Sequence, residues 1–102
     1  VHMVIDRPLG STHPSHSDIV YKVNYGYVPD TMAEDGEEVD VYLLGVSVPV
    51  RDYVGQIIAV IKRHDDNESK LVATPFGVKY SEEEIRELTH FQEKYFNSEI
   101  IM

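Results

Sequence analysis

The order of the periodic segments limits the folds open to this chain more than any other feature. Five segments before residue 75 have the alternating or β-branched pattern of strands, and turn residues separate them; they span 1–6, 19–23, 39–45, 54–63 and 70–74. After the second of them, we expect the chain to turn at Gly26 and Pro29. A parallel βαβ sheet needs a helix between successive strands. No helical pattern occurs in this part of the sequence, so that architecture is excluded.

One amphipathic helix is predicted after the strand segments. Ser81 and Glu84 form a capping box, in which each side chain satisfies a free amide at the helix start. The acids at positions 82–84 also suit this end of the helix dipole. One apolar stripe at helical spacing follows, and it consists of Ile85, Leu88, Phe91 and Tyr95. We therefore predict a mainly β (α+β) fold, a small closed or partly closed β-barrel with one C-terminal amphipathic helix.

Composition and charge restrict the function classes. A chain of 102 residues, 42% of them hydrophobic, suits one domain covering residues 1–102. It has no apolar run long enough to cross a bilayer, and residues 1–15 lack an export pattern, so we expect a cytoplasmic protein. Because cysteine is absent, we expect no thiol chemistry. The net charge of −9 disfavours nucleic acid or an anionic membrane as a partner. Divalent cations can still adapt an acidic pocket to a small phosphorylated ligand.

Two acidic turns precede strand segments. The first contains five carboxylates within seven positions, namely Glu34, Asp35, Glu37, Glu38 and Asp40. Like charges this close repel unless solvent, a basic partner or a bound cation compensates them. Lys70 follows the second turn, which contains Asp65, Asp66 and Glu68. If the two hairpins open the same way, the clusters converge and offer an all-oxygen site of the kind that Mg²⁺ or Mn²⁺ prefers.

Spacing alone leaves a solvated surface open as the alternative, because charge runs in turns are usually exposed to water. Asp40 is the residue that favours a cation site. It lies within an apolar strand, on the same face as Glu38 and Tyr42, where an unpaired carboxylate is costly. The histidines at positions 13, 16 and 64 have no recognisable metal-ligand spacing, so we expect them to be loop residues.

Four segments together resemble a known family: YKVNYGYVPDT, DGEEVDVYLLG, GQIIAVI and KLVATP, the last preceded by the second acidic turn. In order, spacing and aromatic context they resemble the family I soluble inorganic pyrophosphatases over roughly residues 20–75. The resemblance implies a five-stranded barrel of the OB type with C-terminal helices, which agrees with the strand count above. It also implies Mg²⁺-dependent hydrolysis of inorganic pyrophosphate, with Mn²⁺ as an alternative metal, and a symmetric homo-oligomer.

The resemblance further implies roles for individual residues. The ligands expected for a tightly bound metal are Asp35, Asp40 and Glu68; those expected for a metal brought in with the substrate are Asp65 and Asp66. The residues expected to contact phosphate are Lys70, Tyr21 and Tyr95. Tyr25 is expected in the shell around the metal site, and Glu37 takes the place of the residue that steers the attacking water. Catalytic roles therefore fall on Glu37, Tyr25 and Lys70.

The sequence departs from the family's pattern mainly in its N-terminal part. The segment before NYGY is much shortened. The lysine and arginine that line the family's pocket have no clear counterparts here, although Arg7 or Lys22 could take their role. Phe96 replaces the lysine after the helical tyrosine, and Glu37 and Glu68 are each one methylene longer than usual. Weaker substrate binding follows, so a non-catalytic domain that binds metal or phosphate is the main alternative. An oligonucleotide-binding barrel is a third, which the charge of −9 disfavours.

Overall fold

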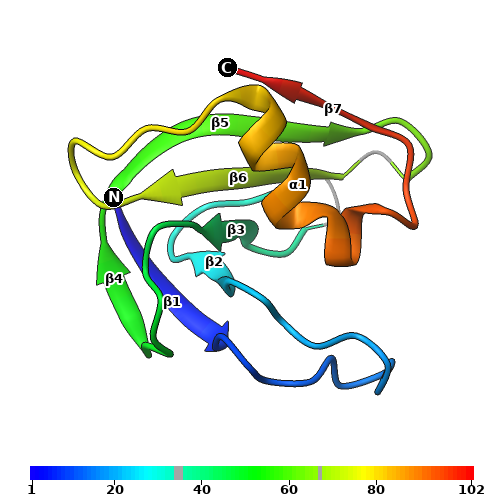
Figure 1. Ribbon diagram of the computed structural model, residues 1–102, viewed down its shortest axis with the longest axis horizontal. Helices are drawn as coiled ribbons and strands as arrows, with labels where there is room; N and C mark the ends of the chain where they lie inside the picture. The colour runs from blue at the N-terminus through cyan, green and yellow to red at the C-terminus, as the bar shows by residue number, and fades with distance from the viewer. Residues whose placement is uncertain (34–35, 67) are drawn as a thin grey trace.

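The computed structural model describes residues 1–33, 36–66 and 68–102, which form seven strands and one helix (Figure 1). The strands are β1 (His2–Arg7), β2 (Asn24–Val28), β3 (Val39–Leu43), β4 (Asp52–Val54), β5 (Gln56–Arg63), β6 (Ser69–Thr74) and β7 (Ser98–Ile101), and the helix is α1 (Glu82–Glu93). They form one sheet in the order β4-β1-β2-β3-β6-β5-β7, with β3 and β6 paired in parallel. The predicted mainly β class with one C-terminal helix is confirmed; the predicted count of five strands omits the short edge strands β4 and β7.

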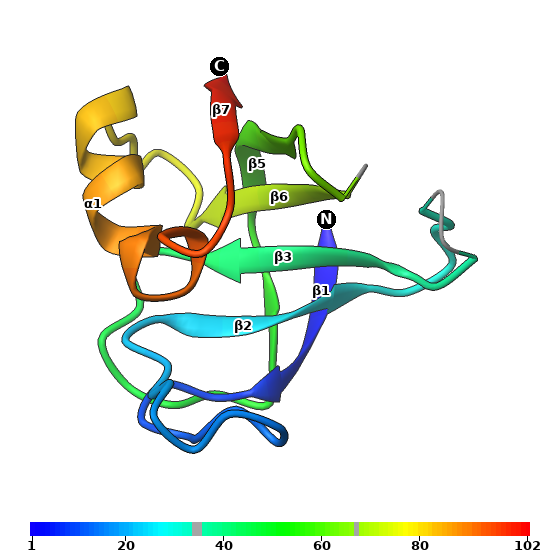
Figure 2. The same ribbon diagram turned by 90° about the vertical axis from the view of Figure 1, so that its right-hand side faces the viewer.

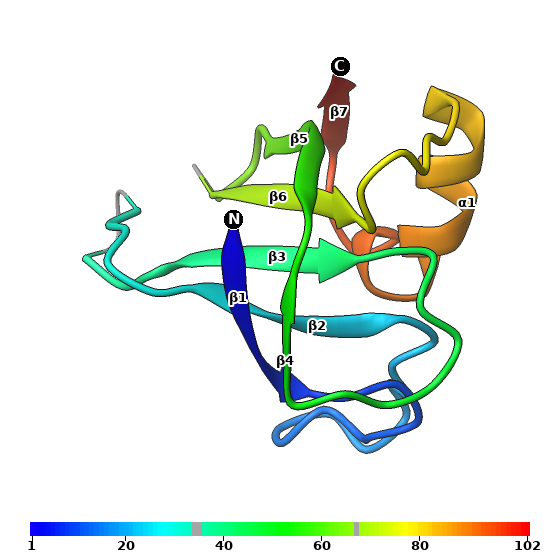
Figure 3. The same ribbon diagram turned by 90° about the vertical axis from the view of Figure 1, so that its left-hand side faces the viewer.

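One continuous stretch of chain links the two ends of the sheet. β4 pairs with β1 at one end, β5 pairs with β6 near the other, and only Gly55 separates β4 from β5 in sequence. A Cβ at Gly55 would overlap the carbonyl oxygen of Thr74, so this backbone approach requires glycine. The sheet therefore curls strongly, as Figures 2 and 3 show from two sides. Because the order of the described strands still has two free ends, the barrel is only partly closed.

The second strand differs from the sequence prediction. A strand is predicted over 19–23 and a turn at Gly26, but β2 covers Asn24–Val28, and the predicted strand contains only an isolated bridge at Val20. The prediction for 19–23 is therefore wrong. A Cβ at Gly26 would overlap the carbonyl oxygen of Val4 in β1. The glycine serves the close approach of two strands, which a local pattern cannot distinguish from a turn.

Side-chain alternation along the strands builds two separate core clusters. In β3, Tyr42 packs in one cluster, whereas Val41 and Leu43 pack in the other, as the alternation in this segment predicts. Ile85 of α1 belongs to the same cluster as Tyr42 and is completely buried. This cluster therefore fixes the helix against the strand that carries Asp40.

The inner face of α1 is more polar than its sequence predicts. Its buried residues are Ile85, Thr89, Gln92 and Glu93, whereas Leu88 of the predicted apolar stripe is 37% exposed. The helix ends at Glu93, so Tyr95 lies beyond it and is 52% exposed. Gln92 and Glu93 are buried because tyrosine and arginine side chains of other segments bind them, as described below, and the Thr89 hydroxyl donates to the Ile85 carbonyl of the same helix. The helix is too short and too polar to cross a membrane, and the described residues contain no other.

The predicted capping box is present at the start of α1. The Ser81 hydroxyl accepts the Glu84 backbone N–H at 3.2 Å, and the Glu84 carboxylate accepts the Ser81 N–H at 2.9 Å. Both residues are exposed, so their contacts stabilise the start of the helix and are not part of the core packing. We expect Ser81→Ala to lower stability by about 1 kcal/mol and the melting temperature by roughly 4–8 °C, measured by circular dichroism. The matched control is Ser17→Ala in an exposed loop; equal melting temperatures for both variants would contradict a capping role.

Candidate active site

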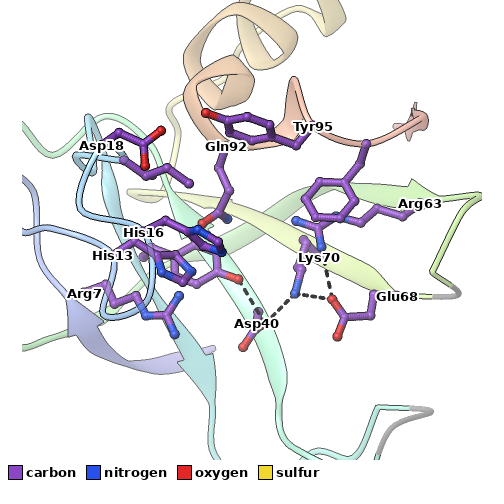
Figure 4. Close-up of a pocket in the computed structure, with 13 residues that line it drawn as sticks. Arg7, His13, His16, Asp18, Asp40, Arg63, Glu68, Lys70, Gln92 and Tyr95 are labelled. Carbon is purple, nitrogen blue, oxygen red and sulfur yellow. Dashed lines mark hydrogen bonds and ion pairs between the residues drawn. The ribbon is translucent and has the colours of Figure 1, made fainter.

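A cavity of about 420 Å³ opens between the loop after β1, the starts of β3 and β6 and the end of α1 (Figure 4). Six of the residues predicted to be functional line it, namely Arg7, Tyr25, Asp40, Glu68, Lys70 and Tyr95. Figure 4 shows Lys70 between Asp40 and Glu68, with Arg7 and two imidazoles on the other side of the space. The cavity therefore brings together residues that are far apart in the sequence.

The parallel pairing of β3 with β6 explains why the two acidic turns meet. Val41 pairs with Leu71, so Asp40 and Lys70, each one residue earlier, lie next to each other on the two strands. Parallel neighbours begin at the same edge of a sheet, so the described parts of the turns that precede them lie on one side of the molecule (Figure 2). The two acidic turns therefore open on the same side, as their convergence requires, and Asp40 and Glu68 come together.

Lys70 joins these two carboxylates. Its Nζ lies 2.5 Å from Asp40 Oδ2 and 2.9 Å from Glu68 Oε2, and the residue is only 4% exposed. The Tyr25 hydroxyl donates to the same Asp40 oxygen at 2.9 Å. Burial, followed by the charge of Asp40, raises the pKa of Tyr25, so its hydroxyl stays protonated as a donor. Among the described residues, Asp40 Oδ1 and Glu68 Oε1 have no hydrogen-bond partner, so each carboxylate retains one oxygen for a ligand.

Arg63, at the end of β5, is a second buried cation of the cavity wall. Its Nε and Nη2 donate to the two carboxylate oxygens of Glu93 at 3.0 and 2.7 Å. Its Nη1 donates to Asp66 at 3.2 Å and to Glu68 at 3.1 Å. The guanidinium also stacks 3.6 Å from the ring centre of Phe96. Burial opposes its charge, but the hydrogen bond to Glu93 and the charge of Glu93 raise the pKa of Arg63.

A chain of largely buried hydrogen bonds runs along the cavity wall. The Arg7 guanidinium donates to the Tyr21 hydroxyl at 2.7 Å, which donates to Gln92 Oε1 at 2.6 Å. Gln92 Nε2 donates to the Tyr42 hydroxyl at 2.7 Å, which donates to Glu93 Oε2 at 2.6 Å. Glu93 in turn holds Arg63. We call this series the buried polar chain; its members are Arg7, Tyr21, Gln92, Tyr42, Glu93 and Arg63.

The buried polar chain includes one residue that was expected to contact phosphate. Tyr21 is completely buried, and its hydroxyl is bound on both sides by Arg7 and Gln92. Burial, opposed in part by the hydrogen bond from Arg7, raises the pKa of Tyr21. Burial of the Arg7 guanidinium acts against its charge, but its hydrogen bond to Tyr21 and the charges nearby raise the pKa of Arg7. In this structure, Tyr21 therefore orients Arg7, which lines the cavity, whereas Tyr21 itself does not.

The remaining predicted residues that the structure describes lie outside the cavity lining. The Asp65 carboxylate accepts the backbone N–H of Asn97 at 3.1 Å, and Asp66 binds Arg63. Glu37 is exposed, and Asp35 falls outside the described residues. Within the described residues, no three histidine or acidic side chains are close enough to one another to hold a metal ion. Of the ligands predicted for the tight metal, the structure brings together Asp40 and Glu68.

Several residues of the cavity were not predicted as functional. Arg63 and Phe96 line it at one end, and His13 and His16 line it at the other, with ring centres 5.0 Å apart. The histidines lie in a loop, as predicted, but face the cavity (Figure 4). Burial, together with the nearby charge of Arg7, lowers the pKa of His13. A signal for Arg63 existed in the sequence: it is the basic residue that ends an apolar strand directly before an acidic turn.

Comparisons with known proteins identify relatives of this chain. The sequence model of the inorganic pyrophosphatase family matches residues 5–100. An inorganic pyrophosphatase of Rhodospirillum rubrum is 34% identical over 82 residues, which are 80% of this chain and 34% of that protein. One of Saccharolobus solfataricus is 33% identical over 64 residues, which are 59% of this chain and 37% of that protein. The chain thus spans little more than a third of the length of these curated relatives.

Two solved structures share the fold. The inorganic pyrophosphatase of Ehrlichia chaffeensis matches 97% of this chain and 82% of its own, with a TM-score of 0.74 and 21% identity. That of Neisseria gonorrhoeae matches 93% of this chain and 72% of its own, with a TM-score of 0.68 and 24% identity. At these identities the likeness concerns the fold alone. Because the family's sequence model covers nearly all of the chain, the chain belongs to the inorganic pyrophosphatase family, as its resemblance to the family I enzymes predicts.

Proposed function

We propose that the protein hydrolyses inorganic pyrophosphate to two phosphates with the help of a divalent cation, Mg²⁺ or Mn²⁺. The observation that carries this proposal is the meeting of Asp40, Glu68 and Lys70 in one cavity. Carboxylates suit the cation, and the cavity also contains Arg7 and Tyr95, whose N–H and O–H groups suit phosphate oxygens.

The donor set fits a divalent cation. Asp40 and Glu68 both reach the Lys70 ammonium, so their oxygens converge on a region that already accommodates a positive charge. Each also keeps one oxygen without a partner among the described residues. These two residues would hold the cation, with Asp35 as the third ligand that the sequence predicts. When bound, the cation neutralises phosphate oxygens and lowers the pKa of a water molecule.

The protein's own residues would position both ends of the reaction. Lys70 and Arg7 would donate hydrogen bonds to phosphate oxygens, and Tyr95 would donate from the rim of the cavity. Tyr25 holds Asp40 in place. We assign to Glu37 the role of accepting the proton of the attacking water. The water oxygen then forms a bond to one phosphorus while the bridging P–O bond breaks, and the bridging oxygen leaves with the second phosphate.

Phosphate release from pyrophosphate by the purified chain tests the proposal. We expect turnover with Mg²⁺ or Mn²⁺ and its loss when EDTA removes the cation, because pyrophosphate and the attacking water repel each other without it. Restoring excess Mg²⁺ after EDTA is the control for irreversible damage to the protein. The absence of turnover with a series of divalent ions would contradict the proposal.

A non-catalytic protein that binds metal or phosphate is the second candidate. One observation favours it: Lys70 already compensates Asp40 and Glu68, and Arg63 compensates Asp66. Calorimetry that shows cation binding without phosphate release would support this candidate. The homo-oligomer and the cytoplasmic location stay predictions.

A further inference from the structure

Arg63 lies beside the acidic turn that was expected to hold a metal brought in with the substrate. We propose that Arg63 takes the place of that second divalent cation and binds a phosphate group of the diphosphate directly, so that the site uses one divalent cation. This inference rests on the proposed function, because it concerns the same substrate in the same cavity. It is carried by the contacts of Arg63, by the charge balance around it and by its one remaining donor.

The guanidinium is held rigidly. Glu93 binds it through two parallel hydrogen bonds, Phe96 stacks on its face, and the residue is 5% exposed. Glu93 is itself fixed by the Tyr42 hydroxyl at 2.6 Å. A guanidinium fixed in this way is preorganised, so its remaining N–H can donate to a phosphate oxygen without further ordering of the side chain.

The acids of the second turn already have partners in the protein. Asp66 accepts Arg63 Nη1 at 3.2 Å with one oxygen and the backbone N–H of Glu68 at 3.1 Å with the other. Asp65 accepts the backbone N–H of Asn97 and does not line the cavity. Both carboxylates of the expected second metal site therefore have protein partners. A cation at this place would have to displace the buried guanidinium.

The charge balance of this network suits one divalent cation. Four carboxylates, those of Asp40, Asp66, Glu68 and Glu93, are joined to the two cations Arg63 and Lys70. Before a diphosphate binds, the described network thus carries two excess negative charges, which one divalent cation neutralises. With Arg63 removed, the excess would be three, and a further cation would be attracted.

Arg63 also keeps a donor for the substrate. A guanidinium has five N–H groups, and four hydrogen bonds from Arg63 occur among the described residues, to Glu93 twice, to Asp66 and to Glu68. The residue lines the cavity, and it shares Glu68 Oε2 with Lys70. A phosphate group in the cavity would therefore meet a guanidinium and an ammonium side by side.

Counting tightly bound Mn²⁺ on the full chain tests the inference. Equilibrium dialysis is carried out with saturating methylenediphosphonate, a diphosphate analogue that cannot be hydrolysed. We expect one Mn²⁺ per wild-type chain. A count of two, or of none, would overturn the inference. The count does not depend on turnover, so a failure of the proposed function, seen as absent phosphate release, is distinguishable from it.

Variants of Arg63 supply the second measurement. We expect Arg63→Gln to weaken methylenediphosphonate binding at least about tenfold at limiting Mn²⁺ and to raise the Mn²⁺ count to two. Arg63→Lys keeps the charge and should keep a count of one. The matched control is Arg86→Gln, which removes an exposed arginine of α1 and should leave the count and the affinity unchanged.

A double variant separates binding from folding. Arg63→Gln leaves Glu93 buried without its counter-ion, which destabilises a protein. Arg63→Gln combined with Glu93→Gln removes both charges, and its circular dichroism spectrum shows whether the fold is retained. The affinity for methylenediphosphonate should fall by the same factor in the double variant as in Arg63→Gln. Wild-type affinity in the folded double variant would overturn the inference.

Discussion

Replacing Asp40 with asparagine should lower kcat/KM for pyrophosphate by about 10²–10³, or about 2.7–4 kcal/mol in the barrier. The Asp40 carboxylate accepts both the Lys70 ammonium and the Tyr25 hydroxyl, and it offers its second oxygen to a cation. An amide at this position would retain an acceptor but lose the charge, so Glu68 alone would compensate the charge of Lys70 and the divalent cation would bind more weakly. The measurement is phosphate release as a function of Mg²⁺ concentration.

The control for this variant is Asp52→Asn, which removes an exposed carboxylate of β4 outside the cavity and should leave kcat/KM unchanged. Circular dichroism of both variants checks that the fold is intact. Full turnover by Asp40→Asn, with an unaltered Mg²⁺ dependence, would mean that Asp40 is not part of the catalytic site. It would also remove the main reason for placing a cation between the two acidic turns.

The largest effect on stability is expected from Gly26→Ala. The added Cβ would overlap the carbonyl oxygen of Val4 and lie 2.8 Å from the Cα of Ile5, and both are backbone atoms that cannot rotate away. β1 and β2 would have to separate. Overpacking of this kind costs typically 1–3 kcal/mol and sometimes more, so we expect a loss of about 3 kcal/mol or more. The corresponding fall in melting temperature is roughly 12–24 °C.

Urea and thermal unfolding measure this effect, with Lys62→Ala as the control because Lys62 is an exposed residue of another strand. The control should stay within about 0.5 kcal/mol of the wild type. If Gly26→Ala unfolded at the wild-type temperature, β1 would not pass as close to β2 as the structure has it. Glycine would then not be required at this position for the packing of the two strands.

Features encoded within a few consecutive residues could be predicted from the sequence. The capping box needs only Ser81 and Glu84, and the two faces of β3 follow from the alternation of its side chains. The resemblance to a family added what local patterns could not, because it related Asp40 to Glu68 and Lys70, which lie far along the chain from it. The structure then brought those three residues together.

Features that depend on contacts between distant segments could not be predicted. Gly26 has the local signature of a turn, and only the approach of β1 shows why it belongs to a strand. Gln92 and Glu93 are polar and were not part of the predicted apolar stripe of the helix, yet they are buried because Tyr21, Tyr42 and Arg63 bind them. A polar residue that is buried with its partner cannot be distinguished from an exposed one until the partner is known.

The buried polar chain has a consequence for how the protein would meet its ligand. Because its members bind one another from β1, β3, β5 and α1, the rotamers of Arg7 and Arg63 are settled when the chain folds. Binding of a small anion then removes little rotational freedom from these side chains, because folding has already ordered them. The helix therefore positions side chains that line the cavity, and on the proposed function we expect that loosening the helix would weaken ligand affinity even in molecules whose strands stayed folded.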